Sequence, residues 1–229
     1  GTTARFHGLL HSGGRYVVSD PQSATECAEE NAILKRIQAD AVEDTGGFFV
    51  VTPGDDPGFA DKFLAGAAAT GVPAREIAVA EALRREPLLN PGILRAIEVE
   101  DGSVDGWQLV WGAARSAQAY GATVLTYHKV VGIERERDRV SAVLARDVKG
   151  GEDVRINCGF VLNCAGPWAG QVAALAGLHD VNVVAGRGIM VAMNHRLVNT
   201  VINRCVYPTD GDILVPVHTV SIIGTTDVK

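Results

Sequence analysis

The longest charge-free stretch of the sequence, residues 156–179, constrains the fold most strongly. It contains no Asp, Glu, Lys or Arg, and it is long enough to supply the roughly 20 apolar residues of a membrane-spanning helix. Two asparagines, a proline, a glutamine and four glycines interrupt it, however. The pattern is more typical of a buried strand at 160–164, a turn at Ala165-Gly166 and a helix from Trp168 to Leu178. Such a strand–turn–helix unit predicts an α/β or α+β fold.

The remaining sequence alternates helical and strand patterns. Asp20-Pro21 predicts a helix start, because Asp20 can accept hydrogen bonds from free backbone N–H groups and Pro21 is tolerated at the first helical position. Further helices are expected at 59–67, 78–85 and 106–120. Strands are expected at 48–51, 93–99, 123–127, 130–134, 140–146, 154–158, 181–184, 189–193, 201–204, 213–217 and 220–223.

The composition is that of an ordinary globular protein, with 229 residues of which 47% are hydrophobic and 21% charged. This length allows one or two domains with a sizeable core. The formal net charge of −6 argues against nucleic acid as a partner. The four cysteines, at positions 27, 158, 164 and 205, include no C-x-x-C pair. They therefore predict no metal site and no redox motif, but free thiols in a reducing cytoplasm.

The stretch from Arg5 to Tyr16 is the richest in groups that can carry chemistry. It holds two histidines, two arginines, a serine hydroxyl and three glycines. Glycines let the backbone approach a flat or anionic ligand closely, histidine accepts a proton near neutral pH, and arginine binds phosphate or carboxylate with two parallel hydrogen bonds. A glycine turn with incidental polar residues is the alternative interpretation.

Two further segments carry candidate residues. Ala165-Gly166 follows an expected strand, and open α/β sheets bind cofactors at the carboxyl ends of their strands. Many strand-to-helix turns contain the same two residues, so this pattern alone is weak. Arg204 lies among apolar residues on another expected strand, where it either faces a pocket or lies on a solvated strand face.

Several motifs, taken together and in order, resemble one enzyme family. They are His7-Gly-Leu-Leu-His11-Ser-Gly-Gly-Arg15-Tyr16, Glu30-Asn31, Asn163-Cys-Ala-Gly-Pro-Trp168, Val201-Ile-Asn-Arg204, Asp212-Ile-Leu-Val-Pro216 and Ile223-Gly-Thr-Thr226. The chain resembles the FAD-dependent glycerol-3-phosphate dehydrogenases, and the large subunit of the anaerobic bacterial type is the nearer match.

The resemblance implies roles for individual residues. Flavin contacts are implied at Arg5, His7, Leu9, His11 and Ser12, an adenine contact at Val130, contacts beside the diphosphate and ribitol at Ala165, Gly166 and Trp168, and further cofactor contacts at Gly224 and Thr225. Arg15, Tyr16 and Arg204 are implied to bind substrate, with Arg15 on its phosphate. The implied catalytic residues are His11, Arg15 and Tyr16, and His11 is either the base or a residue that orients the flavin.

The implied reaction is hydride transfer from C2 of sn-glycerol 3-phosphate to flavin N5, which gives dihydroxyacetone phosphate. The electrons are expected to reach a quinone through partner subunits, with the protein in the cytoplasm or peripherally at the inner face of the cytoplasmic membrane. Two alternatives remain open. One is another FAD-dependent amino-acid or 2-hydroxy-acid oxidoreductase of the same superfamily, and the other is a non-catalytic, flavin-free binding module.

The expected domains interleave along the chain. Residues 1–46 and 100–180 are expected to form an incomplete, Rossmann-like FAD-binding domain, and residues 47–99 and 181–229 a substrate domain on a mostly antiparallel sheet. The sequence contains no G-x-G-x-x-G fingerprint, since Gly186-Arg187-Gly188 lacks the third glycine. We therefore expect the middle part of a longer enzyme, which binds FAD poorly and is inactive by itself.

Overall fold

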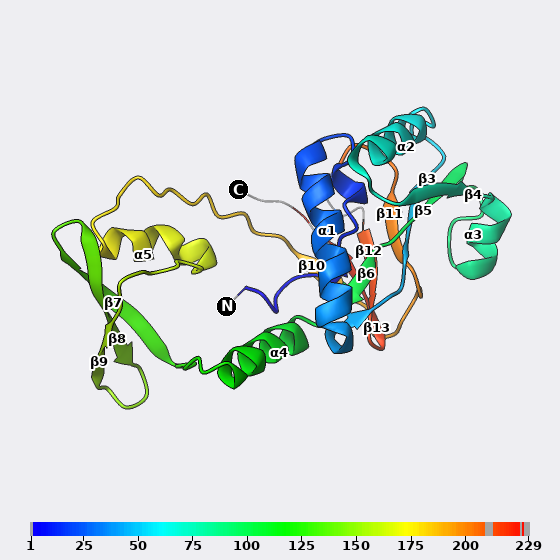
Figure 1. The fold of residues 1–229 in the computed structure, drawn as a ribbon. Coiled ribbons are helices and arrows are strands. Elements are labelled where there is room, and N and C mark those ends of the chain that lie inside the picture. The colour runs from blue at the N-terminus through cyan, green and yellow to red at the C-terminus, as the bar shows by residue number, and fades with distance from the viewer. Residues whose placement is uncertain (1, 209–212, 225, 227–229) are drawn as a thin grey trace. The chain divides into compact units, whose positions relative to one another are not determined.

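The computed structural model describes residues 2–208, 213–224 and 226, and Figure 1 labels its helices and strands. Residue contacts divide the chain into two compact units. The smaller unit comprises residues 114–186, and the larger comprises residues 2–113 together with the described residues from 187 onward. The predicted FAD-binding and substrate domains divide the chain at other points and stay a prediction.

A seven-stranded sheet forms the centre of the larger unit (Figure 1). Its strands, in spatial order, are β10 (Met190–Ala192), β13 (Val220–Gly224), β12 (Ile213–Val217), β11 (Val201–Arg204), β3 (Gly47–Val51), β5 (Arg95–Val99) and β4 (Ala74–Ile77). Neighbouring strands pair antiparallel except β11 and β3, which run parallel with Ile202 opposite Phe48. The expected mostly antiparallel sheet is therefore confirmed.

Helices cover both faces of this sheet, so β3 is buried along its whole length. On one face, Phe49 packs with Phe63 of α2 (Phe59–Thr70) and with Ala24 of α1 (Pro21–Ile37). On the other, Phe48 packs with Ala82 of α3 (Val79–Arg85). Each buried phenylalanine contributes about 1.5–3 kcal/mol through removal of its side chain from water.

The helix boundaries follow from local chemistry. Asp20 accepts a hydrogen bond from the Ser23 N–H at 3.1 Å, and Pro21 begins α1, as the sequence predicts. Gly71 ends α2 in the left-handed conformation, with φ of 72°. The helix expected at 106–120 is α4 (Gly106–Ala119).

A small antiparallel sheet fixes the N-terminal segment. It consists of β1 (Leu9–Leu10), β6 (Gly102–Val104) and β2 (Val42–Glu43), with β6 in the middle. Two short 3-10 helices, η1 (Gly14–Tyr16) and η2 (Ala39–Ala41), follow β1 and precede β2. Because Leu9 pairs with Ser103, the candidate loop is attached to a strand far away in the sequence.

The smaller unit is built on an antiparallel sheet of β7 (His128–Glu136), β8 (Arg139–Asp147) and β9 (Asp153–Asn157). After this sheet the chain passes through η3 (Gly166–Trp168) into α5 (Ala169–Leu175). These elements confirm the strands expected at 130–134, 140–146 and 154–158 and the helix that begins near Trp168.

Three expected strands are wrong. Residues 160–164 have no strand conformation, and Phe160 and Leu162 are 82% and 78% exposed rather than buried. An apolar run becomes a strand only where neighbouring strands supply hydrogen-bond partners, and no strand of the described residues pairs with this segment. Residues 181–184 also lack a paired strand, and at 123–127 the chain turns instead, with a φ of 62° at Tyr127.

Within the described ranges, no helix combines the length and the apolar character needed to cross a membrane. The charge-free stretch that begins at residue 156 accordingly contains only the short helix α5.

Candidate functional site

Two glycines shape the loop that carries most of the predicted site residues. Gly8 has a φ of +82°, and a Cβ built on it would lie 2.7 Å from Cγ2 of Val217. Gly13 has a φ of +97°, and its Cβ would lie 2.2 Å from the carbonyl oxygen of Ala24. Both positions therefore require glycine, and the loop is fitted closely between β12 and α1.

Three predicted residues form a row of rings on this loop. The ring centroids of His7 and His11 are 6.0 Å apart, and those of His11 and Tyr16 are 5.7 Å apart. The Leu9 N–H donates a hydrogen bond to Nδ1 of His7 at 3.1 Å, which assigns the proton of a neutral His7 to Nε2. The structure thus brings together His7, His11 and Tyr16, as the sequence predicts.

The electrostatics of this row favour neutral imidazoles. Burial, together with the charge of Arg15, lowers the pKa of His11 to about 4. Burial, His11 and Arg15 likewise lower the pKa of His7 to about 4. Burial raises the pKa of Tyr16. Near pH 7 the row therefore offers neutral imidazoles that can accept a proton and a phenol that can donate a hydrogen bond.

The two arginines predicted to bind substrate line one narrow hollow of the larger unit, with a volume of about 10 Å³, which is room for about one water molecule. Its walls are Gly14, Arg15, Val18, Phe49, Phe59, Phe63, Arg204, Val206 and Pro208. Arg204 forms an ion pair with the nearly buried Asp55, and its own side chain is 45% exposed. Arg204 thus borders this hollow and is also partly exposed to solvent, so both interpretations describe its position, and its role in substrate binding stays a prediction.

Other predicted cofactor residues lie elsewhere in the larger unit. The Leu9 side chain is buried against Val201, Ile213 and Val215 and is not available to a ligand, and its N–H already donates to His7. Arg5 is exposed. Gly224 pairs with Met190 at the edge of the large sheet, and Thr225 lies outside the described residues.

Three more predicted cofactor residues meet in the smaller unit. Val130, Ala165 and Trp168 line a hollow of about 890 Å³ between β7 and α5. Asn163 fixes the adjoining turn, since its side chain accepts a hydrogen bond from the Ala165 N–H at 3.2 Å and donates one to the Ala169 carbonyl at 2.9 Å. Gly166 has a φ of 56° within this turn, which favours glycine.

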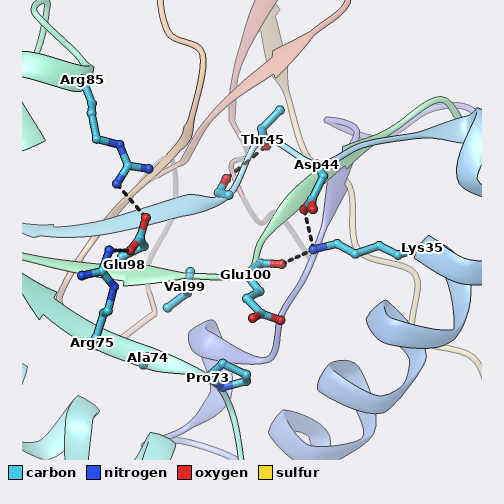
Figure 2. Close-up of a pocket in the computed structure, with 11 residues that line it drawn as sticks. Lys35, Asp44, Thr45, Pro73, Ala74, Arg75, Arg85, Glu98, Val99 and Glu100 are labelled. Atoms are coloured by element: carbon cyan, nitrogen blue, oxygen red, sulfur yellow. Dashed lines mark hydrogen bonds and ion pairs between the residues drawn. The ribbon is translucent and has the colours of Figure 1, made fainter.

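Figure 2 shows another hollow of the larger unit, and its volume is about 730 Å³, far greater than that of the hollow lined by Arg15 and Arg204. Its basic side chains are paired with acids: Lys35 contacts Asp44 at 2.7 Å, and Arg85 contacts Glu98 at 2.6 Å. None of the predicted site residues lines it. Because no predicted site residue is among its walls, we do not assign the substrate to this hollow.

Sequence reasoning gave no role to three polar residues that hold the loop in place, although two of them, Asn31 and Asn203, stand in the motifs that carry the resemblance. The Asn31 amide lies 3.2–3.4 Å from the carbonyl oxygens of Leu10, His11 and Glu100. Asp101 and Asn203 are buried beside Ser12. The sequence around Asp101 indicates only a turn, and nothing in it indicates contacts to residues about a hundred positions away.

Comparison with known proteins gives a family match over the whole chain. Residues 1–229 match the family described as FAD dependent oxidoreductase. The chain is 44% identical to an anaerobic glycerol-3-phosphate dehydrogenase subunit from Haloferax volcanii, over 99% of this chain and 40% of that protein. It is 42% identical to an anaerobic glycerol-3-phosphate dehydrogenase subunit from Escherichia coli, over 100% of this chain and 42% of that protein. The chain thus spans about two fifths of the length of these relatives.

Solved structures show the same fold. L-alpha-glycerophosphate oxidase from Mycoplasma pneumoniae with FAD bound matches 99% of this chain and 62% of its own, with a TM-score of 0.79 and 18% identity. L-proline dehydrogenase from P. horikoshii matches 98% of this chain and 59% of its own, with a TM-score of 0.76 and 20% identity. The fold, the family match over the whole chain and the curated relatives lead to one conclusion: the chain belongs to the FAD-dependent oxidoreductase family.

Proposed function

We propose that this chain forms the flavin-facing loop and the substrate sheet of an enzyme that oxidises sn-glycerol 3-phosphate to dihydroxyacetone phosphate. The observation that carries the proposal is that Arg15 and Arg204 line one hollow, which adjoins the loop of His11 and Tyr16. With a volume of about 10 Å³, this hollow must widen before it admits a phosphate group. The curated relatives named as anaerobic glycerol-3-phosphate dehydrogenase subunits support the choice of substrate.

Arginine suits the phosphate of this substrate. Its planar guanidinium donates two parallel hydrogen bonds to phosphate oxygens and stays charged at all relevant pH values. The floor of the hollow is apolar, with Phe49, Phe59 and Phe63. These aromatic walls strengthen the attraction between arginine and phosphate by lowering the local polarity, while the 45% exposed side chain of Arg204 also remains in contact with solvent. An uncharged or purely aliphatic substrate gains nothing from two arginines here.

The described residues fit FAD in two places. The hollow of Val130, Ala165 and Trp168 offers apolar walls and a backbone turn, which suits a nucleotide, and its volume is in the range of small-molecule sites. The loop from Arg5 to Ser12 offers histidine rings, backbone groups and glycines where a side chain would not fit. When bound, FAD accepts a hydride from C2 of the substrate.

We assign the proton of the C2 hydroxyl to His11. Oxidation removes a hydride from C2 and a proton from the hydroxyl, and the remaining electron pair forms the carbonyl of the product. His11 is neutral near pH 7, so its ring has a lone pair for that proton, while its pKa of about 4 makes it a weaker base than an ordinary histidine. Tyr16 remains protonated and can donate a hydrogen bond to a substrate oxygen. Orientation of the flavin is the alternative role for His11.

The path of the electrons and the domain roles are further parts of the proposal. We infer a quinone acceptor reached through partner subunits, because the relatives are named as one subunit of an anaerobic enzyme. A cytoplasmic location, peripheral at the inner face of the membrane, follows from that acceptor. Residues 1–46 and 100–180 are assigned to FAD, and residues 47–99 and 181–229 to substrate.

Substrate identity can be tested by flavin reduction. The protein is produced from its complete reading frame, loaded with FAD and mixed anaerobically with glycerol 3-phosphate, glycerol, lactate or an amino acid. We expect glycerol 3-phosphate to bleach the absorbance of oxidised flavin, and the other compounds to do so far more slowly. Reduction by lactate or an amino acid, with glycerol 3-phosphate inert, would show that the chain belongs to a different oxidoreductase.

Residues 1–229 produced alone are expected to bind FAD weakly and to show no dehydrogenase activity. The sequence has no G-x-G-x-x-G turn to bind the diphosphate, and Phe160 and Leu162 are exposed beside the turn assigned to FAD. The measurement is the ratio of flavin to protein absorbance after gel filtration with excess FAD. A stoichiometric, yellow protein would contradict this expectation.

A further inference from the structure

Asp101 has the most fully enclosed carboxylate near the candidate site. It lies between β5 and β6 and is 1% exposed. Its Oδ1 accepts hydrogen bonds from the Ser12 N–H at 2.8 Å and from the Ser12 hydroxyl at 2.7 Å. Its Oδ2 accepts a hydrogen bond from the Asn203 side-chain amide at 3.2 Å. Ser12 and Asn203 are themselves 1% exposed, so water does not take part in these bonds.

The surrounding backbone is shaped to admit this side chain. A Cβ at Gly47 would lie 2.7 Å from both Cβ and Oδ2 of Asp101, so β3 must carry glycine at that point. Burial raises the pKa of Asp101, while hydrogen bonds from Ser12 and Asn203 favour its ionised form. Removing a carboxylate from water costs stability, and this cost is offset only when its oxygens are well hydrogen-bonded. The presence of Asp101 at this buried position therefore calls for a role other than packing.

The hydrogen bonds of Asp101 join the two segments that carry the substrate arginines. Ser12 lies three residues before Arg15, and η1 connects them directly. Asn203 immediately precedes Arg204 on β11. One carboxylate thus links the loop and the strand whose arginines line the same hollow, although the two segments are about 190 residues apart in the sequence.

We propose that Asp101 is a positioning residue, which sets the separation of Arg15 and Arg204 by bonding Ser12 and Asn203 simultaneously. This proposal rests on the proposed function for the identity of the ligand, a phosphate group. Two arginines grip one phosphate only when both reach it without strain, so loosening either segment weakens the affinity for phosphate. Asp101 itself touches no reacting atom.

The test uses FAD-loaded protein from the complete reading frame and measures the inhibition constant of inorganic phosphate. This constant reports affinity and does not change with the fraction of folded enzyme. Asp101→Ala removes all three hydrogen bonds and is expected to raise the constant about tenfold or more. Asp101→Asn is the conservative rescue and is expected to stay within about threefold of the wild type.

The rescue has a structural basis in Asn203. Its Oδ1 is buried and has no hydrogen-bond partner among the described residues, so rotation of the Asn203 amide would let this oxygen accept from the new NH₂ group at position 101. The single side-chain oxygen at position 101 would still accept from Ser12. Should Asp101→Ala fail to fold, Asn203→Leu breaks only the bond to β11 and is expected to raise the constant about threefold or more.

Glu86→Ala is the matched control. Glu86 is also a 1% exposed carboxylate. It accepts hydrogen bonds from the backbone N–H groups of Asn199 and Thr200 at 2.9 and 2.6 Å. These two residues immediately precede the first residue of β11, whereas Asn203 lies near its last. We expect it to lower stability without changing the inhibition constant. An unchanged constant in folded Asp101→Ala and Asn203→Leu, or an equal rise in Glu86→Ala, would overturn the positioning role.

A substrate-free measurement separates this proposal from the proposed function. Hydrogen exchange of peptides covering residues 8–16 is expected to speed up in Asp101→Ala and to remain slow in Glu86→Ala. If glycerol 3-phosphate fails to reduce the wild-type flavin, the substrate assignment is wrong. Hydrogen exchange then still tests whether Asp101 holds residues 8–16 in place. If exchange in Asp101→Ala equals that of the wild type, the link itself is overturned.

Discussion

Replacing Arg15 with alanine is expected to lower kcat/KM for glycerol 3-phosphate by about 10²–10³-fold. Arg15 lines the hollow opposite a second arginine, and a phosphate bound there loses one of its two charged partners in the variant. Arg15→Lys is expected to recover only part of the loss, because an ammonium group cannot donate the paired, planar hydrogen bonds. Steady-state reduction of an artificial electron acceptor provides the measurement.

The control for this variant is Arg36→Ala, which removes the same charge from an exposed position on α1. It should leave kcat/KM unchanged. A second readout comes from His11, whose pKa is lowered in part by Arg15 and should rise in Arg15→Ala, as followed by NMR of the imidazole protons. If Arg15→Ala keeps wild-type kcat/KM, the phosphate is not bound at this hollow.

Acidification from pH 7 to pH 5 is expected to destabilise the larger unit strongly. In the folded state the pKa values of His7 and His11 are about 4, well below the ordinary value of 6.5. The unfolded state therefore binds protons first as the pH falls. The two neutral histidines therefore stabilise the folded state fully above pH 6.5. This stabilisation is lost progressively between pH 6.5 and pH 4, and the loss at pH 5 is on the order of 2 kcal/mol for each histidine.

Asp101 acts in the opposite direction, because its raised pKa favours the folded state as the pH falls. Two histidines act against this one carboxylate, so we expect a net loss of stability on acidification. Urea unfolding at pH 7 and pH 5 measures the difference, and the variant His7→Gln with His11→Gln should show a much smaller one. An equal loss in this double variant and in the wild type would mean that other groups cause the acid sensitivity.

Much of the fold was predictable because its signals are local. Asp20-Pro21 begins α1 through a side chain and a ring that act within three residues. The apolar run at 48–51 becomes β3 because neighbouring strands are available on both sides. The run at 160–164 is similarly apolar and has no such neighbour among the described residues, so it remains exposed. Hydrophobicity alone cannot distinguish these two cases, because strand pairing is a property of distant segments.

The candidate site likewise has parts that local sequence patterns indicate and parts that they do not. His7, His11 and Tyr16 are close in the sequence, and a glycine loop brings their rings together. The meeting of Arg15 with Arg204 was predictable only through the family resemblance, because no local pattern links residues so far apart. Neither route indicates Asp101. Its partners lie 89 and 102 positions away, and its own surroundings indicate only a turn.

The aromatic pair that lines the same hollow as the two arginines ties the shape of that hollow to the stability of the fold. Phe49 and Phe63, with ring centroids 4.6 Å apart, belong both to the main hydrophobic core and to the wall of the hollow. Shortening either ring to admit a bulkier alcohol also removes core packing, at a cost of about 3–5 kcal/mol. Selection for a new specificity at this wall is therefore also selection against stability, and a broader pocket should arise only after compensating substitutions elsewhere in the sheet.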